Sequence, residues 1–273
     1  MTAGSLVYVY AVAREPAATL VTMAGTLTGV AGSPVHLVLR SPALAAVVSP
    51  VPERDFHETA LRRHLEDLGW LEALARAHHG VIEAFSTHAT VLPLRLATVY
   101  RDDDRVRAVL HDRQGLFLDR LGRLDGHVEL GVKIYVDRGS DTPSEPAPPA
   151  ASSSDPPLGP GRSYLRHRRA EQDSRNDAER AAERAAERIE ATARAHAVER
   201  ARHRIQEGEL ATAPGVNVSN DAYLVPAAHA DAFRAEALRS TDGLTGVRVD
   251  VTGPWAPYSF AGLPEPDPPG SAP

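Results

Sequence analysis

The chain has 273 residues, of which 42% are hydrophobic and 24% are charged, and these fractions are typical of a globular protein rather than a disordered one. Its formal net charge of -6 excludes the strongly basic surface with which proteins bind nucleic acid or an anionic membrane. There is no cysteine, which excludes disulfides, thiolate metal sites and a cysteine nucleophile.

The start of the chain shows neither the basic region nor the apolar stretch of a secretory signal, because a strand-like run begins directly after Ser5. The apolar runs elsewhere are shorter than the ~20 residues that a membrane-spanning helix needs. We therefore expect a cytoplasmic protein whose partners are proteins, with no nucleic acid and no membrane among them.

The first half of the chain mixes strand-like runs with helical patterns. In chain order we expect a strand over 6–12, a helix over 14–24, strands over 35–39 and 44–48, a helix over 55–85, an extended segment over 90–100, and a helix from Asp102 that ends at Gly126. The second and third strands should form a hairpin. The long helix should be interrupted at Gly69 or Gly80, since glycine is a weak helix former.

The second half begins with a strand-like run and then changes composition. We expect a strand over 128–136, a flexible Pro/Ser-rich loop over 140–161, a charged helical arm over 162–208, a strand over 217–225, a helix over 226–240 and a strand over 246–251. Alanines and one isoleucine form a narrow apolar stripe along the arm, which is typical of a helical hairpin or a coiled-coil-like element.

These elements predict an α+β protein of two domains, each a small mixed sheet with packed helices and a ferredoxin-like character. The expected domains are 1–125 and 126–273, and the second contains the flexible loop, the helical arm and an aromatic C-terminal tail over 252–260.

Aromatic residues are scarce, at 5% of the chain, yet Trp255, Tyr258 and Phe260 gather in the C-terminal tail. Together with Trp70 they are either packed in the core or part of an exposed interaction patch. Arg95 interrupts the apolar run over 91–99. It is expected either to pair with Glu66 or Asp67 or to brace a partner surface.

Five histidines around the long predicted helix invite a metal hypothesis, but their spacing matches no HExxH motif. They are His57, His64, His78, His79 and His88. Surface or capping roles are the preferred interpretation. The three aspartates that begin at Asp102 lack the EF-hand spacing and instead suit a helix N-terminus.

Motifs for nucleotide binding or nucleophilic catalysis are also missing. The glycines at 25, 29 and 32 do not follow a strand as a dinucleotide fingerprint requires, and neither a phosphate-cradle pattern nor a GxSxG elbow is present. Lys133 is the single lysine. The sequence therefore predicts no catalytic residue, no cofactor and no metal.

Six ordered blocks of the sequence resemble the gas vesicle protein family GvpL/GvpF. The blocks are 8–12, 44–52, 65–71, 91–100, 131–135 and 252–260, the last reading Thr-Gly-Pro-Trp-Ala-Pro-Tyr-Ser-Phe. The resemblance implies a non-enzymatic accessory or minor structural protein of gas vesicles, the hollow protein shells that give some microbes buoyancy. It also implies binding to the small hydrophobic shell protein and to other vesicle accessory proteins during assembly.

Two alternatives remain open at the level of the sequence. One is a metal-dependent hydrolase that uses the His57–His88 region, and the other is a homo-oligomeric scaffold that self-associates through the helix over 162–207. Under the favoured hypothesis the first domain binds the shell protein stoichiometrically, and the helical arm serves as a spacer or second contact.

Overall fold

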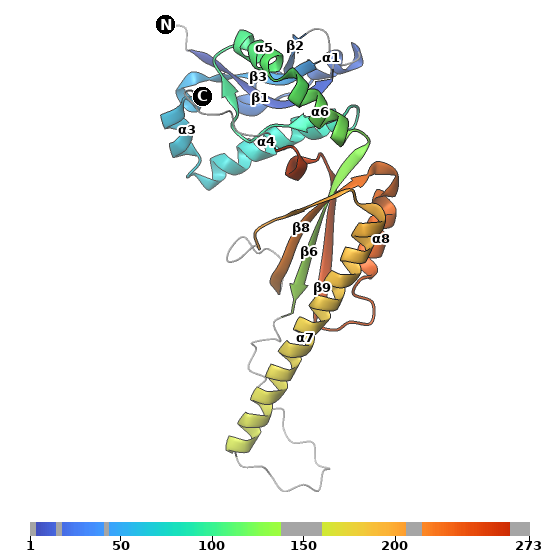
Figure 1. Cartoon of the computed structure of the whole chain (residues 1–273). Helices are drawn as coiled ribbons and strands as arrows, with labels where there is room; N and C mark the ends of the chain where they lie inside the picture. The colour runs from blue at the N-terminus through green and yellow to red at the C-terminus, as the bar shows by residue number, and fades with distance from the viewer. Residues whose placement is uncertain (1–3, 15–17, 41–43, 138–159, 206–214, 263–273) are drawn as a thin grey trace, which may run out of the picture. The chain divides into compact units, whose positions relative to one another are not determined.

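The computed structural model describes residues 4–14, 18–40, 44–137, 160–205 and 215–262 (Figure 1). The chain divides into two compact units. The first comprises Met1–Glu129 together with the chain from Pro254 onward, and the second comprises Leu130–Gly253. The sequence-based boundary assigned the tail over 252–260 to the second domain, whereas its residues from Pro254 onward lie in the first unit.

The first unit is built on a sheet with the strand order β2-β3-β1-β4, and β5 also pairs with β1. Its strands are β1 (Ser5–Arg14), β2 (His36–Arg40), β3 (Leu44–Pro52), β4 (Val91–Pro93) and β5 (Val99–Tyr100). The β2/β3 hairpin expected from the sequence is confirmed by its antiparallel register. The central strand β1 is apolar because it has neighbours on both sides and helices on both faces.

Helices cover both faces of this sheet (Figure 1). They are α1 (Ala18–Ala24), α2 (Glu53–Phe56), α3 (Glu58–His64), α4 (Leu68–Ser86), α5 (Asp103–Asp112) and α6 (Gln114–Leu124). On the α1 and α4 side, Tyr8 and Tyr10 of β1 pack with Phe56, Ile82 and Phe85 in one buried cluster. The buried residues of α5 and α6 lie outside that cluster and pack against the other face.

The predicted helix over 55–85 is three helices, and the prediction that Gly69 or Gly80 interrupts it is wrong. The last break falls just before Leu68, where the carboxylate of Asp67 accepts hydrogen bonds from the N–H groups of Gly69 and Trp70 at 2.9 and 3.1 Å. An N-cap of this kind satisfies N–H groups that have no partner within the helix, so it determines where α4 begins. Both glycines lie inside α4.

The second unit has the strand order β7-β8-β6-β9. Its elements are β6 (His127–Val136), α7 (Pro160–His196), β7 (Glu199–Arg202), β8 (Val216–Pro226), α8 (Ala230–Arg239) and β9 (Val247–Trp255). With two helices inserted between strands and the order 2-3-1-4, this is the ferredoxin-like arrangement. The first unit follows the same order with β1 to β4, so the predicted α+β fold class is confirmed.

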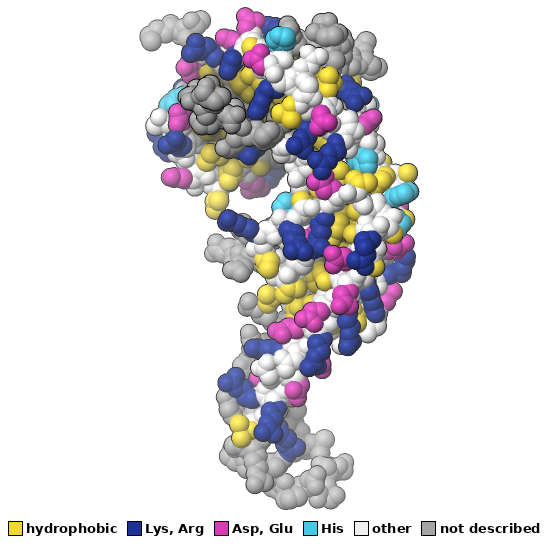
Figure 2. All heavy atoms as spheres, viewed as in Figure 1, with side chains coloured by type: hydrophobic (Ala, Val, Ile, Leu, Met, Phe, Trp, Pro, Cys, Tyr) yellow, Lys and Arg dark blue, Asp and Glu magenta, His cyan; other side chains and the backbone are white. Residues whose placement is uncertain are grey.

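The long helix α7 ends at His196, and the prediction of a helical arm to residue 208 is wrong in its last part. Residues Glu199–Arg202 form β7, which pairs with β8, and the guanidinium of Arg200 makes two 3.0 Å hydrogen bonds to the carboxylate of Asp221. Arginine and glutamate favour a helix locally, but the neighbouring strand decides the structure here. The apolar stripe of α7 is buried, α8 and β8 lie beside this helix, and its outer surface carries mixed charges (Figure 2).

Single 3₁₀ turns complete the described structure, at Val30–Gly32, Ala227–His229 and Tyr258–Phe260. Within the described residues no helix is long and apolar enough to cross a membrane.

Candidate binding pocket

The segment between β4 and β5 bulges away from the sheet edge. Sheet pairing is kept on either side of the bulge, where the N–H of Leu94 donates to the carbonyl of Tyr10 at 2.8 Å and the N–H of Val9 donates to the carbonyl of Thr98 at 2.9 Å. Ala97 has a φ of 64°, a left-handed conformation that alanine rarely adopts. The extended segment predicted over 90–100 is therefore two short strands joined by a loop.

A buried tyrosine and a buried histidine hold this loop. The hydroxyl of Tyr8 accepts a hydrogen bond from the N–H of Ala97 and shares another with Nδ1 of His78, each at 3.0 Å. The backbone of Leu94 favours the charged form of the His78 imidazole, but burial outweighs this effect. Burial lowers the pKa of His78 to about 4, so the imidazole is neutral at neutral pH and needs no counter-charge.

The C-terminal tail is fastened to the first unit at several points. The carboxylate of Glu129 accepts hydrogen bonds from the N–H and the hydroxyl of Ser259, both at 2.7 Å. The hydroxyl of Tyr258 lies 3.0 Å from Nδ1 of His79, and burial raises the pKa of this phenol. Phe260 is buried in the unit. A folded tail thus forms part of the surface next to α4.

Between these parts lies a pocket of about 600 Å³, entirely within the first unit. Its lining comprises Val9, Val12, Ala46, Ala75, His78, His79, Pro93, Leu94, Arg95, Leu96, Thr98, Tyr100, Val106, Val109, Leu110, Arg113, Phe117, Tyr258, Ala261 and Gly262. The floor is formed by buried apolar residues such as Val9, Leu110 and Phe117, and the rim includes the exposed Ala75 and Arg95. This volume is in the range of ligand and peptide pockets.

The structure brings only some of the candidate residues together. Arg95 and Tyr258 line the pocket, whereas Phe260 is buried in the core. Trp255 is 39% exposed, and its indole meets the ring of His79 edge-on at 5.4 Å. Trp70 is half-buried away from the pocket, stacked on His64 at 5.0 Å.

Arg95 does not lie on a buried sheet face, because the strand expected there is interrupted. It is exposed on the loop. Asp67, one of its two expected partners, caps α4 instead.

The five histidines make separate contacts rather than one site. His57 caps α3, His64 stacks on Trp70, His78 bonds to Tyr8, His79 bonds to Tyr258, and His88 bonds to its neighbour Thr87. In the part of the chain that the structure describes, no group of three or more His, Cys, Asp or Glu is placed to hold a metal ion.

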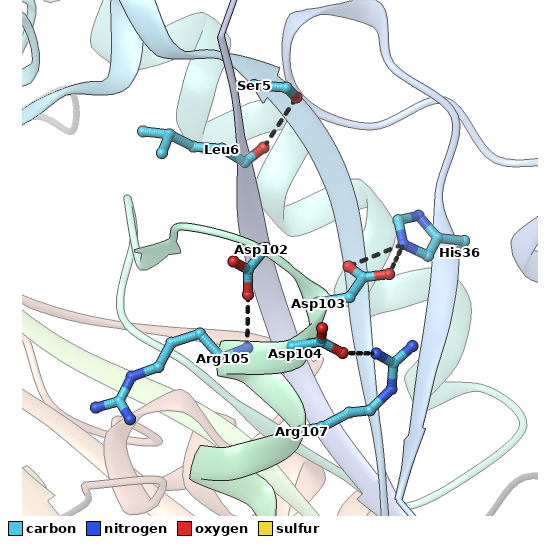
Figure 3. A network of polar contacts seen from close by, with 8 residues as sticks. All are labelled: Ser5, Leu6, His36, Asp102, Asp103, Asp104, Arg105 and Arg107. Carbon is cyan, nitrogen blue, oxygen red and sulfur yellow. Dashed lines mark hydrogen bonds and ion pairs between the residues drawn. The ribbon is translucent and has the colours of Figure 1, made fainter.

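The three aspartates expected at a helix N-terminus are found there (Figure 3). Asp102 is the N-cap of α5 and accepts a hydrogen bond from the N–H of Arg105 at 2.7 Å. Asp103 reaches His36 of β2 at 3.4 Å, and Asp104 pairs with Arg107. Each carboxylate thus has a structural role at this helix end.

Sequence reasoning missed three residues that shape the pocket. Ala75 could not be recognised as a pocket residue, because alanine is common in helices. Tyr8 was predicted only as part of a buried strand. Glu129 could have been found, because a lone carboxylate in an apolar strand pattern indicates a buried hydrogen-bonding partner.

Two solved structures share the fold of this chain. The chain aligns with the crystal structure of the gas vesicle protein GvpF from Anabaena sp. PCC7120 at a TM-score of 0.63, covering 96% of this chain and 98% of that one, with 18% identity. The crystal structure of GvpF from Microcystis aeruginosa aligns at a TM-score of 0.60, covering 94% and 99%, also with 18% identity. At this identity the likeness shows a common fold.

Comparison of sequences identifies the family of the chain, which the structures alone do not. The model of the family described as gas vesicle synthesis protein GvpL/GvpF matches residues 6–262. The chain is 44% identical over 271 residues to gas vesicle protein L of Streptomyces sp. (strain CB03234), covering 98% of this chain and 97% of that protein. Gas vesicle protein F of the same strain is 36% identical over 130 residues, 48% of each chain. The protein belongs to the GvpL/GvpF family and has a role in gas vesicle assembly.

Proposed function

We propose that this protein binds the small hydrophobic shell protein of gas vesicles during assembly, stoichiometrically and without catalysis. Membership of the GvpL/GvpF family supports a role in gas vesicle assembly. The apolar pocket of the first unit supports binding of a hydrophobic partner. The protein would act in the cytoplasm, at the growing vesicle and beside other vesicle proteins.

A hydrophobic shell subunit needs protection before it joins the shell, because exposed apolar surface and free strand edges promote aggregation. The pocket offers apolar walls from both sheet and helices, so a side chain that enters it leaves water. Burial stabilises by roughly 25 cal/mol per Å² of apolar area, so each apolar side chain that enters the pocket favours binding.

The walls of the pocket are held in place before any partner arrives. The loop that carries Arg95 is fixed through Tyr8 and His78, and the tail that carries Tyr258 is fixed through Glu129. A preorganised site loses less conformational entropy on binding than a flexible one, which favours affinity. The charged helix α7 would then serve as a spacer or second contact.

Co-purification tests the proposal. The full-length chain, expressed with the shell protein of the same organism, should retain the shell protein on an affinity resin and elute with it at a fixed ratio. An unrelated soluble protein with the same tag is the control. Shell protein that appears equally in both eluates, or in neither, would refute the binding role.

A further inference from the structure

One edge of the sheet in the second unit is rich in valine. Among the described strands β9 lies at this edge (Figure 1), and its first five residues read Val-Arg-Val-Asp-Val. β-branched residues favour strand pairing, so an edge of this composition can pair with a further strand. The opposite edge is β7, which has only four residues, three of them charged. Short, charged edge strands resist such pairing, whereas β9 has nine residues.

The backbone groups that face outward from β9 follow from its pairing with β6. The carbonyl of Gly246 accepts a hydrogen bond from the N–H of Asp137, which directly follows β6, so the groups of Gly246 point toward β6. Successive residues of a strand direct their N–H and C=O groups to alternate sides. The groups of Val247, Val249 and Val251 therefore point away from the sheet, where a further strand would meet them.

Arg234 of α8 reaches over this edge. Its guanidinium donates hydrogen bonds to the carbonyl of Val251, at 2.9 Å, and to the carbonyl of Gly253. The two carbonyls lie two positions apart on the outward side of β9, and the planar fork of the guanidinium spans both. An arginine side chain thus occupies acceptors, and space beside the strand, that the backbone of a further strand would need.

The charge pattern of β9 makes a second copy of this chain the strand that fits the edge. Two copies aligned antiparallel about Val249 place Arg248 of each copy opposite Asp250 of the other, and Val247 opposite Val251. Within one copy the side chains of Arg248 and Asp250 already form an ion pair on one face of the strand. Opposite charges on directly opposed residues stabilise a strand pair, and the arrangement has the twofold symmetry of most protein dimers.

We propose that Arg234 closes this edge and so prevents two copies of the chain from joining through β9. The inference goes beyond the proposed function, because it concerns self-association through the second unit. Without the guanidinium, the outward N–H and C=O groups along β9 are open to the same groups of a second copy, and the register centred on Val249 pairs them.

Removal of the guanidinium tests the inference in the full-length chain. Arg234→Ala should dimerise at protein concentrations at least about tenfold lower than the unmodified chain, as measured by sedimentation velocity over a concentration series. Arg234→Lys, which keeps an ammonium donor but not the fork, should lie between the two. The control is Arg239→Ala, which removes an exposed arginine from the same helix and should behave like the unmodified chain.

Charge reversals show whether the dimer forms through β9 in the stated register. Added to Arg234→Ala, Asp250→Arg places like charges opposite each other and should return the protein to a monomer. Arg248→Asp combined with Asp250→Arg again places opposite charges across the two strands and should restore the dimer. Association caused by loss of the fold has no reason to follow this pattern.

Self-association of Arg234→Ala that is no stronger than that of Arg239→Ala would overturn the inference. A dimer that survives Asp250→Arg, or one that the exchange of the two charges fails to restore, would overturn it as well. These results are separable from the proposed function, since the pocket lies in the first unit and co-purification tests it independently.

Discussion

Replacing Ala75 with tryptophan is expected to reduce retention of the shell protein by at least about tenfold, because the indole fills the mouth of the pocket. Ala75 is exposed on α4 and lines the pocket, so the larger side chain disturbs no core contact. The measurement is the amount of shell protein that co-purifies with each variant of the full-length chain.

The same helix provides the matched control. Ala73 is also exposed on α4 but does not line the pocket, since positions two apart point to different sides of a helix. Ala73→Trp changes helix propensity and surface hydrophobicity to the same degree and should retain the shell protein like the unmodified chain. Equal loss in both variants, or in neither, would contradict the placement of the binding site.

Stability should fall by about 2 kcal/mol between pH 7 and about pH 5 because of His78 alone. Its pKa is lowered from 6.5 to about 4 in the folded protein, chiefly by burial, and the side chain is only 4% exposed. The unfolded chain therefore binds a proton in this interval that the folded chain does not. Stabilisation from the neutral imidazole is complete above the unfolded pKa and is lost progressively below it.

Chemical denaturation at the two pH values measures this effect. His78→Gln removes the titrating group while its amide can still hydrogen-bond to Tyr8, so the variant should lose about 2 kcal/mol less than the unmodified protein over the same interval. The other histidines are present in both proteins, so their contribution cancels. Parallel pH profiles for the two proteins would show that His78 does not titrate as its burial requires.

Several strands could be predicted from the sequence because their signals depend on local composition. The run that becomes β1 is apolar throughout, and the β2/β3 pair is separated by turn residues, so both were predicted. The β7 strand was missed because Glu199–Arg202 looks helical and becomes a strand only through its pairing with β8. Likewise, the cap at Asp67 outweighed the two glycines that had been expected to break the helix.

The candidate site was only partly predictable. Arg95 and the aromatic tail stood out because such residues are unusual in their surroundings. The pocket itself did not, because it joins parts of the chain as distant as Val9, Ala75 and Tyr258 and depends on a bulged loop. That loop requires a left-handed backbone at Ala97, and alanine, unlike glycine, gives no hint of one.

Photo-crosslinking from position 75 shows whether the shell protein contacts the pocket of the first unit. A photoreactive amino acid is placed at Ala75 or, in a separate protein, at Ala73, and each is irradiated in cells that make the shell protein. If the pocket binds the shell protein, a covalent adduct with it forms from position 75 and little or none forms from position 73. An adduct from position 73 alone, equal adducts from both positions, or none from either would contradict binding of the shell protein at the pocket.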